Sequence, residues 1–346
     1  MEYSAERVQI MAPVFIIAEA GVNHNGDLKL ALALIDAAKQ AGVDAIKFQT
    51  FKTEKIVTHN ANKADYQKNA QAESQFDMIK RLELTYGDFQ TLHAYCKKIG
   101  LIFLSTAADS DSLDFLVDTL HVPTIKIGSG EVNNLIFLKQ IAAKNKPMIL
   151  STGMATLGEV ETAINLIRSV SVAPLTLLHC TTNYPCPMEQ VNLTAMLTLR
   201  DAFKMPVGYS DHTVGIEVPI AAVALGAGVV EKHFTLDKAM EGPDHKASLN
   251  PDELTQMVKA IRHIELAMGD GIKRPSAEEE KNKQVARRRL VVSRDLPKGH
   301  MLTEKDIEFK RANTGLFAEH LELVVGKTLI HGINAETALQ WKHLMT

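Results

Sequence analysis

Short apolar segments alternate with longer helical patterns over most of the chain. Eight segments rich in Val, Ile, Leu and Phe have the length and composition of buried strands. They are Val14–Ala20, Ala45–Thr50, Ile102–Thr106, Thr124–Gly128, Met148–Thr152, Leu175–Cys180, Pro206–Ser210 and Val229–Phe234. Helical patterns fall between or after them, among these Leu28–Ala41, Leu135–Ala143, Leu157–Val170, Val218–Ala227 and Pro251–Met268. This alternation predicts an α/β fold, a (β/α)8 TIM barrel, although a doubly wound open sheet would share the local pattern.

The pattern changes after Met268, where glycine and charged residues replace the apolar periodicity. Such a stretch is typical of a linker between domains. We therefore place a barrel domain at residues 1–271, a linker at 272–288 and a small second domain at 289–346. Three pairs of positions in the second domain align at one constant spacing, namely Asp295 with Gly332, Leu302 with Leu339 and Ile307 with Leu344. This weak repeat predicts two related β-rich halves.

The connection after the second predicted strand, from about Phe51 to Tyr86, is far longer than the roughly 2–6 residues usual between a strand and its helix. Long connections of this kind on a barrel usually cover the active face. We expect a partly helical lid here, and a decorative insertion is the alternative.

Composition and charge exclude several classes of protein. Acidic and basic residues are interspersed, the net charge is −3 and the pI is about 6.5, so nothing favours binding to nucleic acid or to an anionic membrane. No apolar run approaches the ~20 residues of a membrane span. The cysteines lack CxxC spacing and the N-terminus lacks a signal-peptide pattern, which predicts a reducing cytoplasm and a small ligand.

Polar residues end or follow nearly every predicted strand. In a barrel this end of the strands carries the chemistry, because the core tolerates few unpaired polar groups. In chain order these residues are Glu19, Lys47, Gln49, Thr106, Lys126, Ser129, Glu131, Ser151, Thr152, Thr181, Thr182, Ser210, Asp211, His212, Glu231 and His233. The set as a whole indicates an active site at the carboxyl ends of the strands, whereas any single member is a weak indication.

Lys47 and Lys126 lie within otherwise apolar strands, where a lysine must reach either solvent or an anion. The alternative is a side chain that extends outward between helices. Ser-Gly at 129–130 and Ser-Thr-Gly at 151–153 add hydroxyl groups and backbone amides just before helices, an arrangement that suits phosphate oxygens. Neither GxxxxGK[ST] nor GxGxxG occurs, so nucleotide binding has no support.

His212 and His233 end or follow consecutive predicted strands, so both imidazoles should emerge at one end of a parallel sheet. Neutral imidazole nitrogens suit a divalent metal, and carboxylates or water complete the coordination of Mn²⁺ or Mg²⁺. One such histidine alone would be interpreted as structural, but two on neighbouring strands favour metal binding. Glu19 is a candidate third ligand or substrate anchor. His24 belongs to an Asn-His-Asn-Gly turn, where its side chain either lines the site or stabilises the turn itself.

Two loops offer further candidates. Asp244, in Gly-Pro-Asp-His, faces the barrel mouth or caps a helix through an Asx turn. Tyr184 begins a stiff Tyr-Pro-Cys-Pro loop in which cis and trans X-Pro bonds are both open. Cys180 and Cys186 have no visible partner base, so we do not expect catalytic thiols.

As a set, the motifs resemble those of the sialic acid (N-acetylneuraminate) synthases and their relatives, the legionaminate and pseudaminate synthases. The matching stretches are IIAEAGVNHNGD, DAIKFQTFK, KIGSGEVNN, ILSTGMAT, LLHCTTNYP, GYSDHT, EKHFTLDK and GPDHKASLNPDEL, which span the barrel. KGHMLTEKDIEFKR and the later VVGKTL resemble the C-terminal antifreeze-protein-like (SAF) domain of that family. The resemblance therefore implies a TIM barrel followed by a small β-rich SAF domain.

The resemblance also implies condensation of phosphoenolpyruvate with the open-chain aldehyde of N-acetylmannosamine or a related sugar, with release of phosphate. His212 and His233 match metal ligands, with Mn²⁺ as the expected ion and Mg²⁺ or Co²⁺ as alternatives. The positions that match the phosphoenolpyruvate site are Lys47, Gln49, Thr106, Lys126, Ser129, Ser151 and Ser210. The positions that match residues near the sugar and the reacting carbons are Glu19, Glu131, Tyr184 and Asp244, and Thr182 is assigned to substrate binding with them.

Arg311 matches an arginine of the SAF domain that reaches the sugar's N-acetyl region in the partner subunit's barrel, which implies a domain-swapped homodimer. Glu131 is expected to manage a proton or position water, with Glu19 as its rival. The chain departs from the family where it reads Ser-Thr-Ala-Ala at 105–108 and Ala-Asn-Thr-Gly at 312–315, which bears on sugar specificity and on the arginine loop.

N-acetylneuraminate synthase is the function favoured at this point. The alternative is N,N′-diacetyllegionaminate or pseudaminate synthase, acting on a 2,4-diacetamido-6-deoxy hexose. Two remoter functions are an aldol enzyme that uses phosphorylated sugars and a carbohydrate- or ice-binding protein with a vestigial barrel. The contacts that select the sugar are expected in residues 51–86 and around Asp244.

Overall fold

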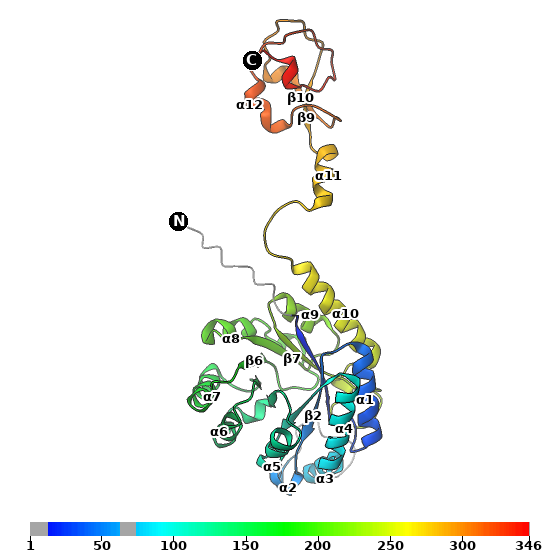
Figure 1. Ribbon diagram of the computed structural model, residues 1–346, viewed down its shortest axis with the longest axis vertical. Coiled ribbons are helices and arrows are strands. Elements are labelled where there is room, and N and C mark those ends of the chain that lie inside the picture. The colour runs from blue at the N-terminus through cyan, green and yellow to red at the C-terminus, as the bar shows by residue number, and fades with distance from the viewer. Residues whose placement is uncertain (1–12, 63–73, 346) are drawn as a thin grey trace. The chain divides into compact units, whose positions relative to one another are not determined.

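The computed structural model describes residues 13–62 and 74–345, and its first compact unit, which ends at Asp270, holds a closed barrel of eight parallel strands. The strands are β1 (Phe15–Gly21), β2 (Ala45–Thr50), β3 (Ile102–Ala107), β4 (Ile125–Ile127), β5 (Met148–Ser151), β6 (Leu175–His179), β7 (Val207–Asp211) and β8 (Val229–His233). Each strand pairs with the next, and β8 pairs with β1. The TIM-barrel prediction is confirmed, and an open doubly wound sheet is excluded (Figure 1).

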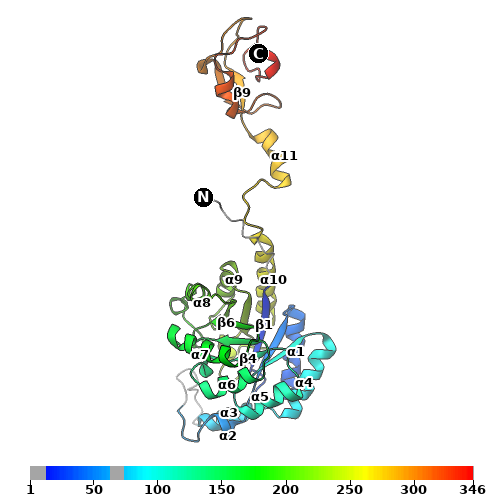
Figure 2. The ribbon, with the colours of Figure 1, turned by 60° about the vertical axis from the view of Figure 1, so that its left-hand side comes forward.

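Helices connect the strands and surround the barrel (Figures 1 and 2). They are α1 (Leu28–Ala41), α4 (Tyr86–Ile99), α5 (Ser110–Asp114), α6 (Leu135–Ala143), α7 (Leu157–Val170), α8 (Ala195–Phe203), α9 (Glu217–Ala224) and α10 (Pro251–Met268). The predicted end of α9 at Ala227 is wrong, because Gly226 adopts a left-handed φ of 98° that a helix cannot continue. No helix among the described residues is long and apolar enough to cross a membrane.

Side-chain caps set the starts of several helices that follow the strands, although α8 and α9 begin without one. Thr156 and Glu159 form a capping box at the start of α7, and Asn250 and Glu253 form another at the start of α10. Pro251 occupies the first turn of α10, where its missing N–H costs no hydrogen bond. The backbone therefore turns from loop to helix at defined positions, which keeps the residues at the strand ends in place.

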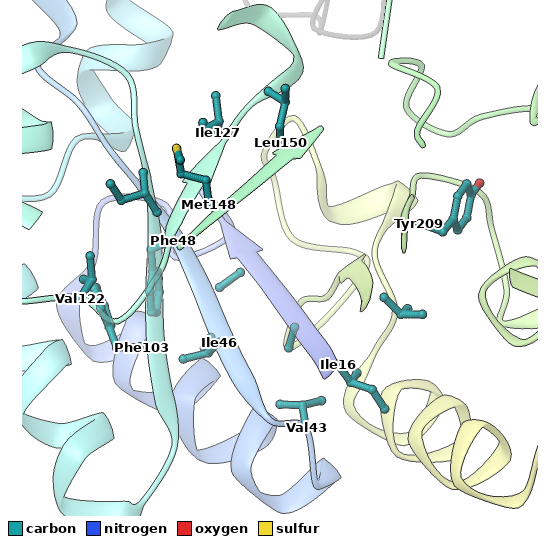
Figure 3. Packing of buried hydrophobic residues seen from close by; sticks show 14 of the residues in the cluster. Ile16, Val43, Ile46, Phe48, Phe103, Val122, Ile127, Met148, Leu150 and Tyr209 are labelled. Atoms are coloured by element: carbon teal, nitrogen blue, oxygen red, sulfur yellow. The ribbon is translucent and has the colours of Figure 1, made fainter. Parts of the chain in front are cut away.

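Alternate residues of each strand belong to two different cores. Outward residues such as Ile16, Ile46 and Phe48 pack in the main core between strands and helices (Figure 3). Inward residues form a separate cluster inside the barrel, made of Ile17, Ala45, Leu104, Ile149, Leu178 and Val229. This inner cluster fills the barrel, so inward side chains two residues farther along lie above it, at the carboxyl ends of the strands.

The long connection after β2 contains two short helices, α2 (Thr53–Ile56) and α3 (Gln75–Leu82), which contact each other. They lie together beside the barrel in both views (Figures 1 and 2). Their partly helical character agrees with the prediction. The middle of the predicted lid, residues 63–73, lies outside the described residues.

The second compact unit begins at Gly271. Most of the segment predicted as a linker forms helix α11 (Ala277–Ala286), which was not predicted from the sequence. No side chain of α11 is buried, which explains why the sequence shows no apolar periodicity, but the Ser276–Glu279 capping box marks its start. The rest is a small domain with the antiparallel strands β9 (Arg289–Val292) and β10 (Ile307–Lys310), isolated β-bridges and the short helix α12 (Leu321–Val324).

Candidate active site

The polar residues of the barrel mouth form one side-chain layer. On each strand or at its end, one inward side chain lies just above the inner apolar cluster. These side chains are Glu19, Lys47, Thr106, Lys126, Ser151, Cys180, Ser210 and Glu231. Strand pairing places Glu19 opposite Lys47, and Ser210 opposite Glu231. The period of two along each strand therefore brings residues distant in sequence to one level inside the barrel.

A cavity of about 220 Å³ lies over this layer. The predicted site residues that line it are Glu19, Lys47, Gln49, Thr106, Lys126, Ser129, Ser151, Thr182, Tyr184, Ser210, His212 and His233. Glu231, Cys180, Met154 and two glycines, Gly128 and Gly130, complete the lining. Candidates from all eight strands and their loops thus converge on one cavity, whereas Glu131, Asp244 and Arg311 do not line it.

Lys47 and Lys126 both point into the barrel. Lys47 Nζ lies 2.8 Å from Glu19 Oε2 and donates to Thr106 Oγ1 at 3.0 Å. Lys126 Nζ donates to Ser151 Oγ at 2.7 Å. The alternative of lysines extending outward between helices is excluded for both. Two buried ammonium groups beside one cavity favour a ligand with negative charge.

Glu231 connects the two lysines, and it was noted in the sequence only as a strand-end residue, not as a site candidate. Its Oε1 accepts a hydrogen bond from Ser210 Oγ at 3.0 Å and lies 3.4 Å from Lys126 Nζ. Its Oε2 is 3.8 Å from Lys47 Nζ and is buried without a hydrogen-bond partner. The available signal was an acid two residues before His233, and hence on the same face of the strand.

Burial raises the pKa of Glu19 to about 7, against the opposing effect of Lys47, and the nearby Glu231 adds to the rise. Burial also tends to raise the pKa of Glu231, but Lys126 and Lys47 together lower it below its ordinary value. Burial lowers the pKa of Lys126. Burial thus favours the protonated form of Glu19, whereas the two lysines favour the carboxylate form of Glu231.

Ser129, Gly153 and Thr182 form a polar cradle at the Lys126 side of the cavity. Ser129 Oγ accepts a hydrogen bond from the Gly153 amide at 2.9 Å. A Cβ atom at Gly153 would lie 2.3 Å from Thr182 Oγ1 and 2.9 Å from Ser129 Oγ, so only glycine fits there. Thr182 Oγ1 is buried without a hydrogen-bond partner. An unpaired hydroxyl that lines the same cavity as a buried lysine is suited to an anionic oxygen of a ligand.

His212 and His233 also line the cavity and lie side by side, with ring centroids 5.4 Å apart. His212 Nδ1 donates to the Thr181 carbonyl at 2.6 Å, which leaves its Nε2 lone pair free. His233 Nδ1 is buried without a hydrogen-bond partner. Burial lowers the pKa of both imidazoles, so both are neutral at physiological pH. The ring of Tyr184, whose bond to Pro185 is cis, lies 4.1 Å from the His212 ring.

The histidine pair fits a divalent metal by its chemistry. Two neutral imidazoles with free nitrogens are suitable ligands, and one of them already holds the backbone hydrogen bond that orients metal-binding histidines. Within the described parts of the chain, no group of three or more His, Cys, Asp and Glu side chains gathers as a complete metal site.

The other predicted residues have different surroundings. Asp244 does not cap a helix with its side chain; its Oδ2 lies 3.8 Å from His233 Nδ1, so it faces the mouth. Glu131 accepts a hydrogen bond from Asn134 Nδ2 at 2.8 Å. His24 serves its turn, since its Nδ1 accepts from the Gly26 amide at 3.0 Å. Arg311 belongs to the second compact unit, where it follows β10 and is exposed.

A second cavity of about 290 Å³ adjoins the first and shares Gln49, Thr106, Tyr184 and His233 with it. Its remaining lining residues are Val22, Phe51, Ile56, Met78, Ile79, Leu82, Ala108, Pro243 and Asp244. Most of these are apolar and come from the connection after β2. The two cavities therefore differ in character: the first is charged and the second mostly apolar.

Comparison with known proteins places this site in a family. A profile of the NeuB family matches residues 34–273, and a profile of the SAF domain matches residues 287–345. The crystal structure of an N-acetylneuraminic acid (sialic acid) synthetase from Leptospira borgpetersenii is 36% identical and has a TM-score of 0.71, over 78% of this chain and 90% of that chain. Both the barrel and the C-terminal domain thus have known counterparts.

Two curated relatives are similar over nearly the whole chain. N,N'-diacetyllegionaminic acid synthase of Legionella pneumophila is 47% identical over 95% of this chain and 94% of its own length. N,N'-diacetyllegionaminic acid synthase of Campylobacter jejuni is 50% identical over 92% of this chain and 96% of its own length. The chain therefore belongs to the NeuB family of nonulosonate synthases, transferases that here carry a SAF domain at the C-terminal end.

Proposed function

We propose that the protein condenses phosphoenolpyruvate with the open-chain aldehyde of an N-acetylated amino-hexose and releases phosphate. One observation supports this above all: two buried lysines and a hydroxyl cradle share a single cavity with a pair of neutral histidines. An anionic donor held at the lysines and an aldehyde held at the histidines meet in that cavity.

The donor is assigned to the Lys126 side. Lys126, Ser151 and Thr182 offer positive charge and hydroxyl groups to the phosphate and carboxylate oxygens of phosphoenolpyruvate. Lys47 is held by Glu19 and Thr106 and neutralises charge at the centre of the layer. The same groups stabilise the leaving phosphate as its charge develops.

The reaction balances with one water molecule. C3 of phosphoenolpyruvate forms a bond to the aldehyde carbon, water adds at C2, and the bond from C2 to the phosphate oxygen breaks. The water oxygen becomes the new keto oxygen, and its two protons end on the new hydroxyl group and on phosphate. We assign proton handling to Glu19 rather than to Glu131, because Glu19 lines the cavity with a pKa of about 7 while Glu131 does not line it.

His212 and His233 are assigned to a divalent metal, with Mn²⁺ as the expected ion. Such an ion, when bound, supplies Lewis-acid polarisation of the acceptor's aldehyde oxygen. Thr181 keeps the His212 ring oriented for this role through its carbonyl oxygen. Asp244 is close enough to His233 to orient that ring or a hydroxyl group of the acceptor.

Two acceptors are in competition. N-acetylmannosamine, the sugar first favoured by the sequence, would make the protein an N-acetylneuraminate synthase. The names of the two relatives at 47% and 50% identity favour a 2,4-diacetamido-6-deoxy hexose instead, and we adopt it as the acceptor. Arg311 reaching a partner subunit's barrel in a domain-swapped homodimer, and a cytoplasmic location, remain predictions from the resemblance and the composition.

The test is phosphate release from phosphoenolpyruvate with Mn²⁺ present. We expect release only when an N-acetylated amino-hexose is added, and faster release with the 2,4-diacetamido-6-deoxy sugar than with N-acetylmannosamine. Release only with phosphorylated sugars would instead select the aldol enzymes that use sugar phosphates. No release with any candidate sugar would remove the proposed function.

A further inference from the structure

The second cavity offers an apolar surface at the place where an acceptor sugar has to extend. We propose that this cavity is a subsite for the far end of the acceptor and that it selects a sugar ending in a methyl group over one ending in a hydroxymethyl or phosphate group. The inference rests on the proposed function and identifies the surface that recognises the far end of the acceptor.

Continuity between the cavities sets the direction of the acceptor. The aldehyde carbon has to lie in the first cavity, near His233 and the donor. His233, Tyr184 and Gln49 also line the second cavity, so they form the junction between the two. The donor occupies the Lys126 side of the first cavity. The carbon chain of the acceptor therefore extends from the junction into the second cavity.

The wall opposite the junction is apolar. Val22, Phe51 and Leu82 are buried in one cluster, and Ile56 and Ile79 pack against it while lining the cavity. α2 and α3 supply Ile56, Ile79 and Leu82, so the connection after β2 builds most of this wall. Such a surface gains free energy by covering a methyl group and loses it by desolvating a hydroxyl group without a hydrogen-bond partner.

Three lysines in or next to α2 and α3, namely Lys52, Lys55 and Lys80, are already paired with acids, Lys55 with Asp111. Lys80 Nζ lies 2.9 Å from Glu54 Oε1 and 3.1 Å from Glu83 Oε2, and Lys52 Nζ lies 3.2 Å from Glu83 Oε1. Among the described residues, the lining of the second cavity contains neither lysine nor arginine. Its acidic member is Asp244. A phosphate group at the end of the sugar would therefore meet an apolar wall and a carboxylate there.

The expected selectivity has a bounded size. A hydrophobic pocket discriminates one small group on a substrate by roughly 10- to 200-fold. We therefore expect the ratio of kcat/KM for the 6-deoxy acceptor to that for its 6-hydroxy analogue to be at least about 10. The phosphorylated acceptor should be rejected more strongly than either.

The experiment measures phosphate release by the full-length protein with the 6-deoxy, 6-hydroxy and 6-phosphate forms of the acceptor. I79T and I56T replace an ethyl group on the wall with a hydroxyl group, which makes the side chain both polar and smaller, and the same chemical change is made in the control. I264T is the matched control, because Ile264 of α10 is also partly buried but packs on the main core and lines neither cavity. Thermal unfolding verifies that each variant is folded.

We expect I79T and I56T to lower the preference for the 6-deoxy acceptor by about 5-fold or more, chiefly through the acceptor's KM, with the KM for phosphoenolpyruvate unchanged. I264T should keep the wild-type preference. Equal kcat/KM for the 6-deoxy and 6-hydroxy acceptors in the wild type, or an unchanged preference in both wall variants, would overturn the subsite while leaving the proposed function in place. No release with any acceptor would overturn the proposed function, and the subsite with it.

Discussion

Asp211 and Lys232 form an ion pair that is fully buried on the outer side of the barrel. They are direct partners across β7 and β8, so their neighbours Ser210 and Glu231 point inward to the cavity. Tyr209 OH donates to Asp211 Oδ1 at 3.0 Å, and the Thr213 amide donates to the same oxygen at 3.1 Å. On the outer side of the barrel, this network connects β7 and β8. His212 follows β7 and His233 ends β8, so the network supports the strands that position both histidines.

Breaking this pair should destabilise the protein strongly. D211A or K232M leaves a buried charge without its partner, which costs roughly 3–5 kcal/mol in free energy of unfolding. The double replacement D211L/K232M leaves neither charge and should cost much less than the sum of the single changes. Urea unfolding measures all three, and single variants within about 1 kcal/mol of wild type would contradict a structural role for the pair.

Lys126 should act on the donor. K126M removes the ammonium group that donates to Ser151, and we expect kcat/KM for phosphoenolpyruvate to fall by roughly 100-fold or more, because a preorganised charge partner of the phosphate is lost. K139M is the control, since Lys139 of α6 is exposed and lines neither cavity. Steady-state kinetics measure kcat/KM for phosphoenolpyruvate in both variants. A similar decrease in K126M and K139M would show that Lys126 does not bind the donor.

The histidine pair is expected to bind Mn²⁺ in the absence of substrates. H212A and H233A should each weaken Mn²⁺ binding by at least about 10- to 100-fold, the size of effect seen even for residues that only support a metal ligand. H263A, at an exposed position of α10, should bind Mn²⁺ as the wild type does. Titration followed by electron paramagnetic resonance reports binding without catalysis, and unchanged binding in H212A and H233A would place the metal elsewhere.

Glu83 should make the α2 region sensitive to acid. Its carboxylate accepts hydrogen bonds from the Thr53 amide at 3.1 Å and the Thr53 hydroxyl at 2.8 Å. Although burial opposes it, these bonds and those from Lys80 and Lys52 lower the pKa of Glu83 from 4.5 to about 2. A carboxyl with a lowered folded pKa stabilises the fold above its unfolded pKa, and that stabilisation is lost as the pH falls from about 5 toward 2.

Hydrogen exchange of peptides covering α2 measures this effect locally. The wild type should be better protected than E83Q at pH 7, and the difference should narrow as the pH falls below about 4.5, the ordinary pKa of the group. The conservative variant keeps the size of the side chain but not its charge. A difference that stays constant down to pH 3 would show that the charge of Glu83 does not hold α2.

Much of the barrel was predictable because its strands are short apolar runs with clear helical patterns between them. Strand β2 and the helices α1, α6, α7 and α10 have the predicted bounds. α11 was missed because none of its side chains is buried, so the sequence has no apolar stripe to reveal it. Exposed helices of this kind are recognised by their caps and charges rather than by periodicity.

The cavity residues were predictable where strand ends carry isolated polar groups in apolar surroundings, as Lys47 and Lys126 do. The ion pairing of Glu231 with both lysines was not, because it depends on the register by which the barrel closes. The alternatives open for Asp244 and His24 were decided by loop geometry, which placed one at the mouth and the other in its own turn. The apolar second cavity depends on how α2 and α3 pack against Val22 and Phe51, which follow β1 and β2, and no local pattern encodes this packing.

The most direct test of the account is the fate of the donor's carbon atoms. The protein is incubated with Mn²⁺, phosphoenolpyruvate labelled with ¹³C at every carbon and the 2,4-diacetamido-6-deoxy hexose, and the products are followed by mass spectrometry with a phosphate assay. We predict one product that contains the acceptor's carbons together with all the labelled carbons, formed in equal amount with phosphate. Phosphate accompanied by labelled pyruvate, with an unlabelled and unchanged sugar, would contradict the condensation.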